Sequence, residues 1–280
     1  MVAHVISQWL SRNERAIVRR AVPKPSAAHA MNPGFPAIQP ADNKQALWDG
    51  FCAAHGIAAA SVPLFAADTN GVVEVVHLRP GGVPFLRRSA AMEGMIGSSV
   101  QSVFAGSPST YEGLLYLMLR LDSQGRVIPL YVGRAGRHGK NGTMVSANLK
   151  NIEQVRTGAG WTNGHKFERW GYGYAYHIGD LSCAVLNGHE PRRPAQKYVR
   201  WAHQLFESAP TTAPQLRFDV RFWCTPWGPA SPGIWSEFGS CPLAFIEYLL
   251  IGVASLLFPN DLLNEEGVNR RSAECDQPQV

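Results

Sequence analysis

The feature that most constrains the fold is a pair of apolar segments joined by a short turn. Residues 114–121 are almost entirely apolar, as expected of a strand buried in the middle of a sheet. Residues 122–125 (Asp-Ser-Gln-Gly) have the composition of a turn, and residues 127–132 form a second apolar segment. Pro129 lacks a backbone N–H, which favours a sheet edge or a bulge at this point. The pattern predicts a β-hairpin over residues 114–132.

Further elements are predicted on both sides of this hairpin. Apolar periodicity, with a proline at the start of two segments, predicts helices over residues 44–60, 143–155, 194–206 and 242–257. Alternating or apolar runs predict strands over residues 71–78, 171–178 and 216–223. Glycine and serine are frequent in residues 81–110, which are expected to form a loop or a short helix. Flexible tails are expected over residues 1–43 and 269–280.

The net charge of +5 is concentrated in the middle of the chain. Residues 120–221 contain 15 Lys or Arg and 7 Asp or Glu, a net charge of +8, which leaves −3 for the remainder. A basic central region suits a phosphate-binding surface. A solvated basic surface explains the same charge equally well.

The cysteines and the hydropathy predict a cytoplasmic protein that does not enter a membrane. The five cysteines are odd in number and include no CxxC pair, so neither a disulfide framework nor a structural zinc site is expected. The longest apolar segment, residues 243–258, is short for a membrane span and contains Glu247. Arg12, Glu14 and Arg15 interrupt the N-terminal apolar residues, unlike a signal peptide.

Two tyrosines of the hairpin are candidate catalytic residues. Tyr116 lies within the first strand and Tyr131 near the end of the second, so antiparallel pairing can bring the two phenols together. A phenol can orient a water molecule, or act as a base where a metal or another cation lowers its pKa from about 10. Cross-strand packing of the two rings is the alternative interpretation.

A basic, glycine-rich segment follows Tyr131. Residues 133–142 are expected to form a loop in which glycines let the backbone approach a ligand and basic side chains contact a phosphate. The candidates in it are Gly133, Arg134, Gly136, Arg137, Gly139 and Lys140. A flexible basic surface loop is the alternative interpretation.

Glu247 is the third candidate, because it lies on an apolar face of a predicted helix. The positions sharing that face are Leu243, Leu250, Ile251 and Ala254. A carboxylate buried there without a partner is costly, so it needs a cation, a hydrogen-bond network or a metal. A single carboxylate suits a hard cation such as Mg²⁺. An internal salt bridge is the alternative interpretation.

Taken in order, these segments resemble the GIY-YIG nuclease superfamily. Residues 114–116 (Leu-Leu-Tyr) lie where that family has Gly-Ile-Tyr, and residues 131–135 (Tyr-Val-Gly-Arg-Ala) are similar to its Tyr-Val-Gly-Lys-Ala motif. Glu247, followed by a proline and then by Leu-Asn ending at Asn264, resembles the carboxylate helix and closing asparagine of the family. The similarity extends over residues 111–266.

The resemblance implies an α+β fold: a small antiparallel or mixed sheet flanked by helices, with an N-terminal extension and insertions. It implies a nuclease domain over residues 111–268, preceded by an accessory region over residues 44–110. Glu247 would hold one divalent metal, Mg²⁺ or Mn²⁺, and both tyrosines would act on the attacking water. An arginine such as Arg134 would stabilise the pentavalent phosphate, assisted by Asn264.

One position departs from the family pattern. The helix after the second motif usually carries an arginine, and residues 145–152 contain none. The residues expected to replace it, or to bind substrate beside it, are Arg134, Arg137, Lys150, Arg169 and His177. The sequence leaves open which of them serves.

The leading hypothesis is a divalent-metal-dependent endonuclease acting on DNA, with restriction or defence enzymes as one expected type. The alternative is a nucleic-acid-binding protein that keeps the scaffold and has lost catalysis. A third hypothesis is a structural or interaction protein whose tyrosines and Glu247 only pack, with Glu247 in a salt bridge remote from both tyrosines. A common cleft around Tyr116, Tyr131, Glu247 and an arginine would separate the first two hypotheses from the third.

Overall fold

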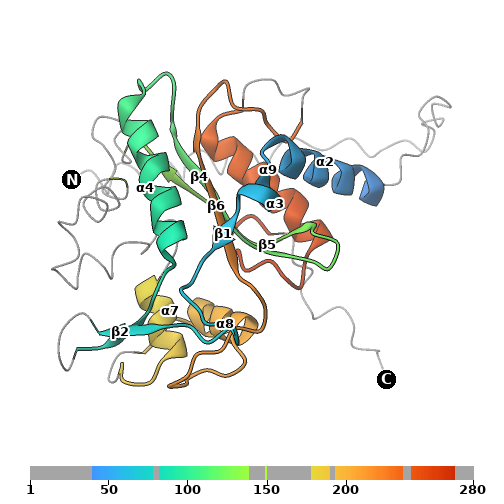
Figure 1. The fold of residues 1–280 in the computed structure, drawn as a ribbon. Coiled ribbons are helices and arrows are strands. Elements are labelled where there is room, and N and C mark those ends of the chain that lie inside the picture. The colour runs from blue at the N-terminus through green and yellow to red at the C-terminus, as the bar shows by residue number, and fades with distance from the viewer. Residues whose placement is uncertain are drawn as a thin grey trace, which may run out of the picture. The chain divides into compact units, whose positions relative to one another are not determined.

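A four-stranded antiparallel sheet forms the centre of the fold (Figure 1). The structure is a computed structural model, and it describes residues 40–77, 82–138, 149, 178–189, 193–235 and 241–268. In order across the sheet, the strands are β1 (Val62–Pro63), β6 (Arg221–Trp227), β4 (Gly113–Leu121) and β5 (Val127–Gly136). Strand β4 therefore lies between two hydrogen-bonded neighbours, and β5 forms an edge.

The predicted β-hairpin is confirmed as β4 and β5. Gly125 N donates to Asp122 O at 3.0 Å and closes the turn. Gly125 has a φ of 77°, a left-handed backbone conformation that residues with a side chain rarely adopt. The register shifts between Met118 and Leu119, which pair with Tyr131 and Pro129, so the intervening residue of β5 is a bulge. Pro129 thus lies on an edge strand and beside a bulge.

Strand β5 is longer than predicted. Residues 133–136 were expected to begin a loop, and that prediction is wrong. They pair with residues 113–116 of β4. Backbone pairing with β4 continues the strand through a Gly-Arg-Ala-Gly segment that has little strand propensity of its own.

Alternate side chains of β4 face two separate hydrophobic cores. Leu114, Tyr116 and Met118 face a core that also contains residues of α4 (Ala90–Ala105), α7 (Ile178–Val185) and α8 (Gln196–Leu205). Leu115, Leu117 and Leu119 face a core that contains residues of α2 (Pro40–Ala54) and α9 (Leu243–Leu257). Figure 1 shows α4 on one side of the sheet and α2 with α9 on the other. Helices thus cover both faces, in the predicted α+β class.

Helix α4 occupies residues for which only a loop or a short helix was predicted. Ser89 is its N-cap, and the Ser89 hydroxyl accepts from Met92 N at 2.9 Å. The buried Gly97 and Ser99 belong to its buried face, and their small size permits close packing on the sheet. The glycines and serines that suggested a loop therefore serve helix packing. A second, two-stranded sheet of β2 (Val75–His77) and β3 (Pro84–Leu86) precedes this helix.

Other boundaries differ from prediction in smaller ways. The helix predicted over residues 44–60 is divided into α2 and α3 (Ile57–Ala60) at Gly56, which has a φ of 57°. Strand β6 begins at Arg221, five residues later than predicted, while α8 and α9 agree closely with prediction. Ile178 begins α7 and does not end a strand. The predicted strand residues 171–177 lie outside the described residues, as does the predicted helix 143–155 except for the helical Leu149.

Residues 44–110, predicted to be an accessory region, contribute β1 to the central sheet, and α3, α4 and most of α2 to the layers around it. The predicted tails lie outside the described residues, apart from residues 40–43, which begin α2. Among the described helices, none combines the length and the hydropathy needed to cross a lipid bilayer.

Candidate functional site

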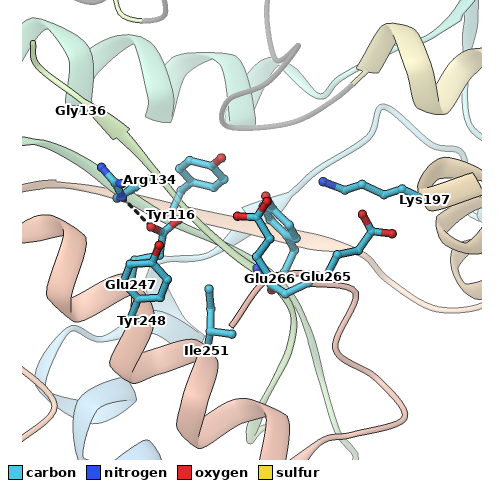
Figure 2. Close-up of a pocket in the computed structure, with 11 residues that line it drawn as sticks. Tyr116, Arg134, Gly136, Lys197, Glu247, Tyr248, Ile251, Glu265 and Glu266 are labelled. Carbon is cyan, nitrogen blue, oxygen red and sulfur yellow. Dashed lines mark hydrogen bonds and ion pairs between the residues drawn. The ribbon is translucent and has the colours of Figure 1, made fainter. Parts of the chain in front are cut away.

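A polar pocket opens beside the outer edge of β5 (Figure 2). Its volume is about 430 Å³, and its lining comes from β4, β5, α8, α9 and the segment after α9. All five residues predicted to be catalytic line it: Tyr116, Tyr131, Arg134, Glu247 and Asn264. The other described residues that line it are Gly136, Lys197, Tyr248, Ile251, Glu265 and Glu266. Segments far apart in the sequence thus meet in one site.

The two tyrosines lie on the same face of the hairpin. Tyr116 pairs with Gly133, and Tyr131 pairs with Met118, so the two phenols are diagonal cross-strand neighbours. Their ring centroids are 6.3 Å apart with an interplanar angle of 29°. The predicted proximity of the phenols is confirmed. Ring packing, the alternative interpretation, is also present, and both residues line the pocket as well.

Gly133 makes room for the phenol of Tyr116. A Cβ at Gly133 would lie 2.5 Å from Oη and 2.6 Å from Cε2 of Tyr116, closer than side-chain atoms approach one another. The ring of Tyr116 therefore crosses the edge strand directly over the glycine backbone. Figure 2 shows its hydroxyl turned toward the space between the Glu247 and Lys197 sides of the pocket. Gly133 therefore contributes to the site by leaving space for the Tyr116 ring.

Both phenols are protonated at neutral pH, and burial moves their ionisation further from it. Burial raises the pKa of Tyr116 well above its ordinary value of 10.0, and the nearby Tyr131 and Glu247 add to the increase. Burial likewise raises the pKa of Tyr131 to about 12, with Glu247 and Glu266 adding to the increase. Each phenol is therefore an uncharged hydroxyl that can donate or accept a hydrogen bond. Action as a base would require a cation close enough to reverse this shift.

Glu247 meets a cation at the edge of the sheet. Arg134 of β5 pairs with Leu115, and its Nε donates to Oε2 of Glu247 at 2.5 Å. The side chains are 38% and 17% exposed, respectively. Arg134 is thus a partner for the carboxylate on the apolar helix face. The salt bridge of the third hypothesis is present, but it is not remote from the tyrosines, because Tyr116 and Tyr131 line the same pocket.

Glu112 fixes the N-terminal end of α9, the helix that carries Glu247. Pro242 lacks an N–H and precedes the helix, and Oε2 of Glu112 accepts from Leu243 N at 2.7 Å. A carboxylate at this position satisfies an unpaired donor and complements the helix dipole. Burial raises the pKa of Glu247 above its ordinary value of 4.5, Arg134 opposes the increase, and Glu266 adds to it. The surroundings therefore disfavour the charged carboxylate on balance, and Arg134 offsets part of that effect.

Asn264 fastens the segment after α9 to the edge of β5. Its Nδ2 donates to Val132 O at 2.8 Å, and its Oδ1 accepts from Val132 N at 2.9 Å. One residue earlier, Leu263 N donates to Leu130 O at 2.7 Å. This segment thus satisfies backbone groups of the edge strand that β4 does not use. The amide of Asn264 holds the wall of the pocket next to Tyr131.

The remaining predicted residues are not brought into the pocket by the described structure. Nη1 of Arg137 donates to Val103 O and to Gly106 O, both at 2.8 Å, at the C-terminal end of α4. Its guanidinium therefore satisfies carbonyls at a helix end. The predicted substrate-binding residues Lys140, Lys150, Arg169 and His177 lie outside the described residues.

Sequence reasoning missed four of the charged or aromatic residues that line the pocket. They are Lys197, Tyr248, Glu265 and Glu266. Tyr248 follows Glu247 on α9 and is 55% exposed. Tyr248 could have been predicted because it is adjacent to Glu247 in the sequence. Glu265 and Glu266 could have been predicted because they directly follow Asn264. Lys197 had no such signal, because 63 residues separate it from Arg134 and α8 comes close only through the tertiary fold.

The charge of the pocket bears on what it can bind. Arg134 and Lys197 bring two positive charges, and Glu247, Glu265 and Glu266 bring three negative charges. Among the described residues, no three His, Cys, Asp or Glu side chains lie close enough together to hold a metal ion. Mg²⁺ is often held by one or two carboxylates, with water and substrate phosphates completing the shell. The residues present therefore fit a one-carboxylate site at Glu247.

The geometry joins two phenols, an arginine and a carboxylate at the edge of one sheet. Comparisons of the chain with models of known protein families, with curated proteins and with solved structures found no match. The chemistry of the pocket is therefore argued from its own residues.

Proposed function

We propose that the chain is a divalent-metal-dependent endonuclease that hydrolyses phosphodiester bonds in DNA. One observation carries the proposal: Tyr116, Tyr131, Arg134 and Glu247 share a single pocket. These residues come from three elements, and each side chain has a role in phosphodiester hydrolysis. The resemblance of the hairpin and of the Glu247 helix to GIY-YIG nucleases supports the same function.

Arg134 supplies positive charge for the phosphate. Its Nε is engaged by Glu247, and the planar guanidinium carries two further nitrogens that can donate to phosphoryl oxygens. With 38% of its side chain exposed, Arg134 is accessible to a ligand. Charge that develops on the phosphoryl oxygens during in-line attack would be stabilised by these donors.

The two phenols orient the attacking water. Both carry a proton at neutral pH, as an ordinary phenol does, and burial raises their pKa further. An uncharged hydroxyl can accept from the water and donate to a phosphoryl oxygen, which fixes the direction of attack. Asn264 has a positioning role, since it holds the chain beside Tyr131 through the backbone of Val132.

Glu247 is the proposed ligand of the metal, Mg²⁺ or Mn²⁺. When bound, the metal would neutralise charge on the phosphate and make a water molecule more acidic. Among its described lining residues, the pocket has one more carboxylate than it has cations. An anionic substrate is therefore accepted more readily together with a divalent cation than without one.

Plasmid cleavage in Mg²⁺ or Mn²⁺ tests the proposal. Wild-type protein is expected to nick or linearise the plasmid, EDTA to stop the reaction, and Glu247→Gln to reduce the rate by about 100-fold or more. Glu74→Gln is the matched control, because Glu74 also pairs with an arginine, Arg87, at 2.6 Å and does not line the pocket. Unchanged cleavage in Glu247→Gln, with the metal requirement intact, would overturn the proposal.

A nucleic-acid-binding protein without catalysis is the second candidate. The observation that favours it is the Arg134–Glu247 ion pair, because an oxygen already bonded to a guanidinium is a weaker metal ligand. This candidate predicts salt-sensitive DNA binding with no cleavage in any divalent metal. The same preparation, assayed for binding and for cleavage, separates the two functions.

A further inference from the structure

Lys197 reaches the pocket from the wall opposite Arg134 and Glu247. It lies in the first turn of α8, and Figure 2 shows its side chain extending from that helix toward the other walls. Among the described lining residues, Lys197 and Arg134 are the two cations. A ligand in the pocket therefore has a positive charge on either side of it.

Aromatic rings hold the ammonium group of Lys197 in place. Its Nζ lies 5.3 Å from the ring centroid of Tyr131, 5.6 Å from that of Tyr198 and 5.2 Å from that of Trp201. Tyr198 and Trp201 are buried and anchor α8 in the core. Ring faces attract a cation but carry no net negative charge. The ammonium group is thus oriented by these three rings.

The position of Lys197 in α8 opposes the electrostatics of the helix. The N-terminal end of a helix carries partial positive charge and favours acidic side chains. The first turn of α8 contains no acidic residue, and Ala195 provides no side-chain cap. Helix stability alone would not select a lysine in this turn. Its positive charge and that of the helix end both favour an anion at this wall.

We infer that Lys197 contacts a backbone phosphate of the bound nucleic acid and is the second cation of the site. This inference rests on the proposed function. Arg134 is partly engaged by Glu247, so a second cation on the facing wall lets the pocket clamp a phosphodiester from two sides. The contact of Nζ with the Tyr131 ring also couples the position of the lysine to that of the phenol.

The test measures binding of a short fluorescent DNA duplex in EDTA, at several salt concentrations. Lys197→Gln is expected to weaken binding about 5- to 10-fold at low salt and to reduce the salt slope by about one phosphate contact. Lys197→Arg is expected to restore both. Lys44→Gln makes the same change of charge on α2, away from the pocket, and is expected to leave both unchanged.

The salt slope separates a phosphate contact from a structural role. Weaker binding of Lys197→Gln with an unchanged slope, or binding equal to wild type, would overturn this inference alone. Wild-type protein that neither binds nor cleaves DNA would overturn the proposed function as well. Lys197→Met keeps the aliphatic stem against the rings, and it replaces the glutamine variant in the assay if that variant folds poorly.

Discussion

Nε of Arg134 donates to Oε2 of Glu247 at 2.5 Å, joining the edge strand β5 to helix α9 across 113 residues of sequence. The pair forms part of the pocket that Tyr116 and Tyr131 also line. Because Arg134 is partly exposed, solvent screens the pair, and its contribution to stability is expected to be modest. Its main consequence is to oppose the increase that burial causes in the pKa of Glu247, beside two protonated phenols.

Glu247 is expected to reduce the stability of the fold at neutral pH. Burial raises its pKa above 4.5 in the folded protein. A carboxyl group with a raised pKa stabilises the fold fully below the unfolded pKa, and this contribution is lost as pH rises through the folded pKa. Glu247→Gln stays uncharged, so it is expected to be at least as stable as wild type at pH 7, with the difference shrinking toward pH 4.5. Urea denaturation followed by tryptophan fluorescence measures this, and a much less stable variant at pH 7 would contradict it.

The phenols are expected to act without ionising. Tyr116→Phe and Tyr131→Phe keep the stacked rings and remove only the hydroxyls, so both variants should fold and bind DNA within about twofold of wild type. Single-turnover cleavage is expected to fall by about 100-fold or more. Because burial raises the pKa of Tyr131 to about 12, the metal-free protein should show no titration of this phenol between pH 7 and 10. Loss of affinity with an unchanged cleavage rate would contradict an orienting role.

Gly133 is expected to tolerate no side chain. A methyl group in Gly133→Ala would displace the Tyr116 ring, which packs against Phe222 as well as Tyr131. Cleavage should fall by about 10-fold or more, as when a reacting group is misplaced. Gly136→Ala is the control on the same strand, because its Cβ would meet its nearest atom, His138 O, at 3.5 Å, an ordinary contact. Equal activity of the two alanine variants would show that the position of Tyr116 does not matter.

Arg137 is expected to contribute to stability and little to DNA affinity. Its guanidinium satisfies Val103 O and Gly106 O at the end of α4. Arg137→Gln should therefore lower the free energy of unfolding by about 1–3 kcal/mol, while DNA affinity at fixed salt stays within about twofold. Arg134→Gln, three residues earlier in β5, should lower DNA affinity and change the free energy of unfolding little. A larger loss of affinity in the Arg137 variant would restore its sequence-based assignment to substrate binding.

Local sequence patterns were sufficient for the elements with strong periodicity. The apolar run of residues 114–121 and the turn at residues 122–125 predicted the hairpin, and Pro129 predicted an edge or a bulge, of which the structure has both. The apolar residues around Glu247 predicted α9 and the need for a partner. Each of these inferences depends on neighbours within one turn or one strand, which is the range over which side-chain periodicity acts.

Other elements depended on contacts that the local pattern does not contain. Helix α4 is rich in glycine and serine, and its packing against the sheet, together with the Ser89 cap, makes it a helix. Residues 133–136 become a strand because β4 supplies partners for their backbone. In both cases tertiary interactions overrule a weak local propensity.

For the candidate site, the sequence by itself determined the two tyrosines of the hairpin and a carboxylate that required a partner. Only the tertiary structure decided that the partner is Arg134, that Arg137 serves a helix end, and that Lys197 faces the pair. The physical reason is distance along the chain. Periodicity places a side chain on a face, whereas ion pairs and pockets form between faces brought together by the burial of two cores on either side of β4.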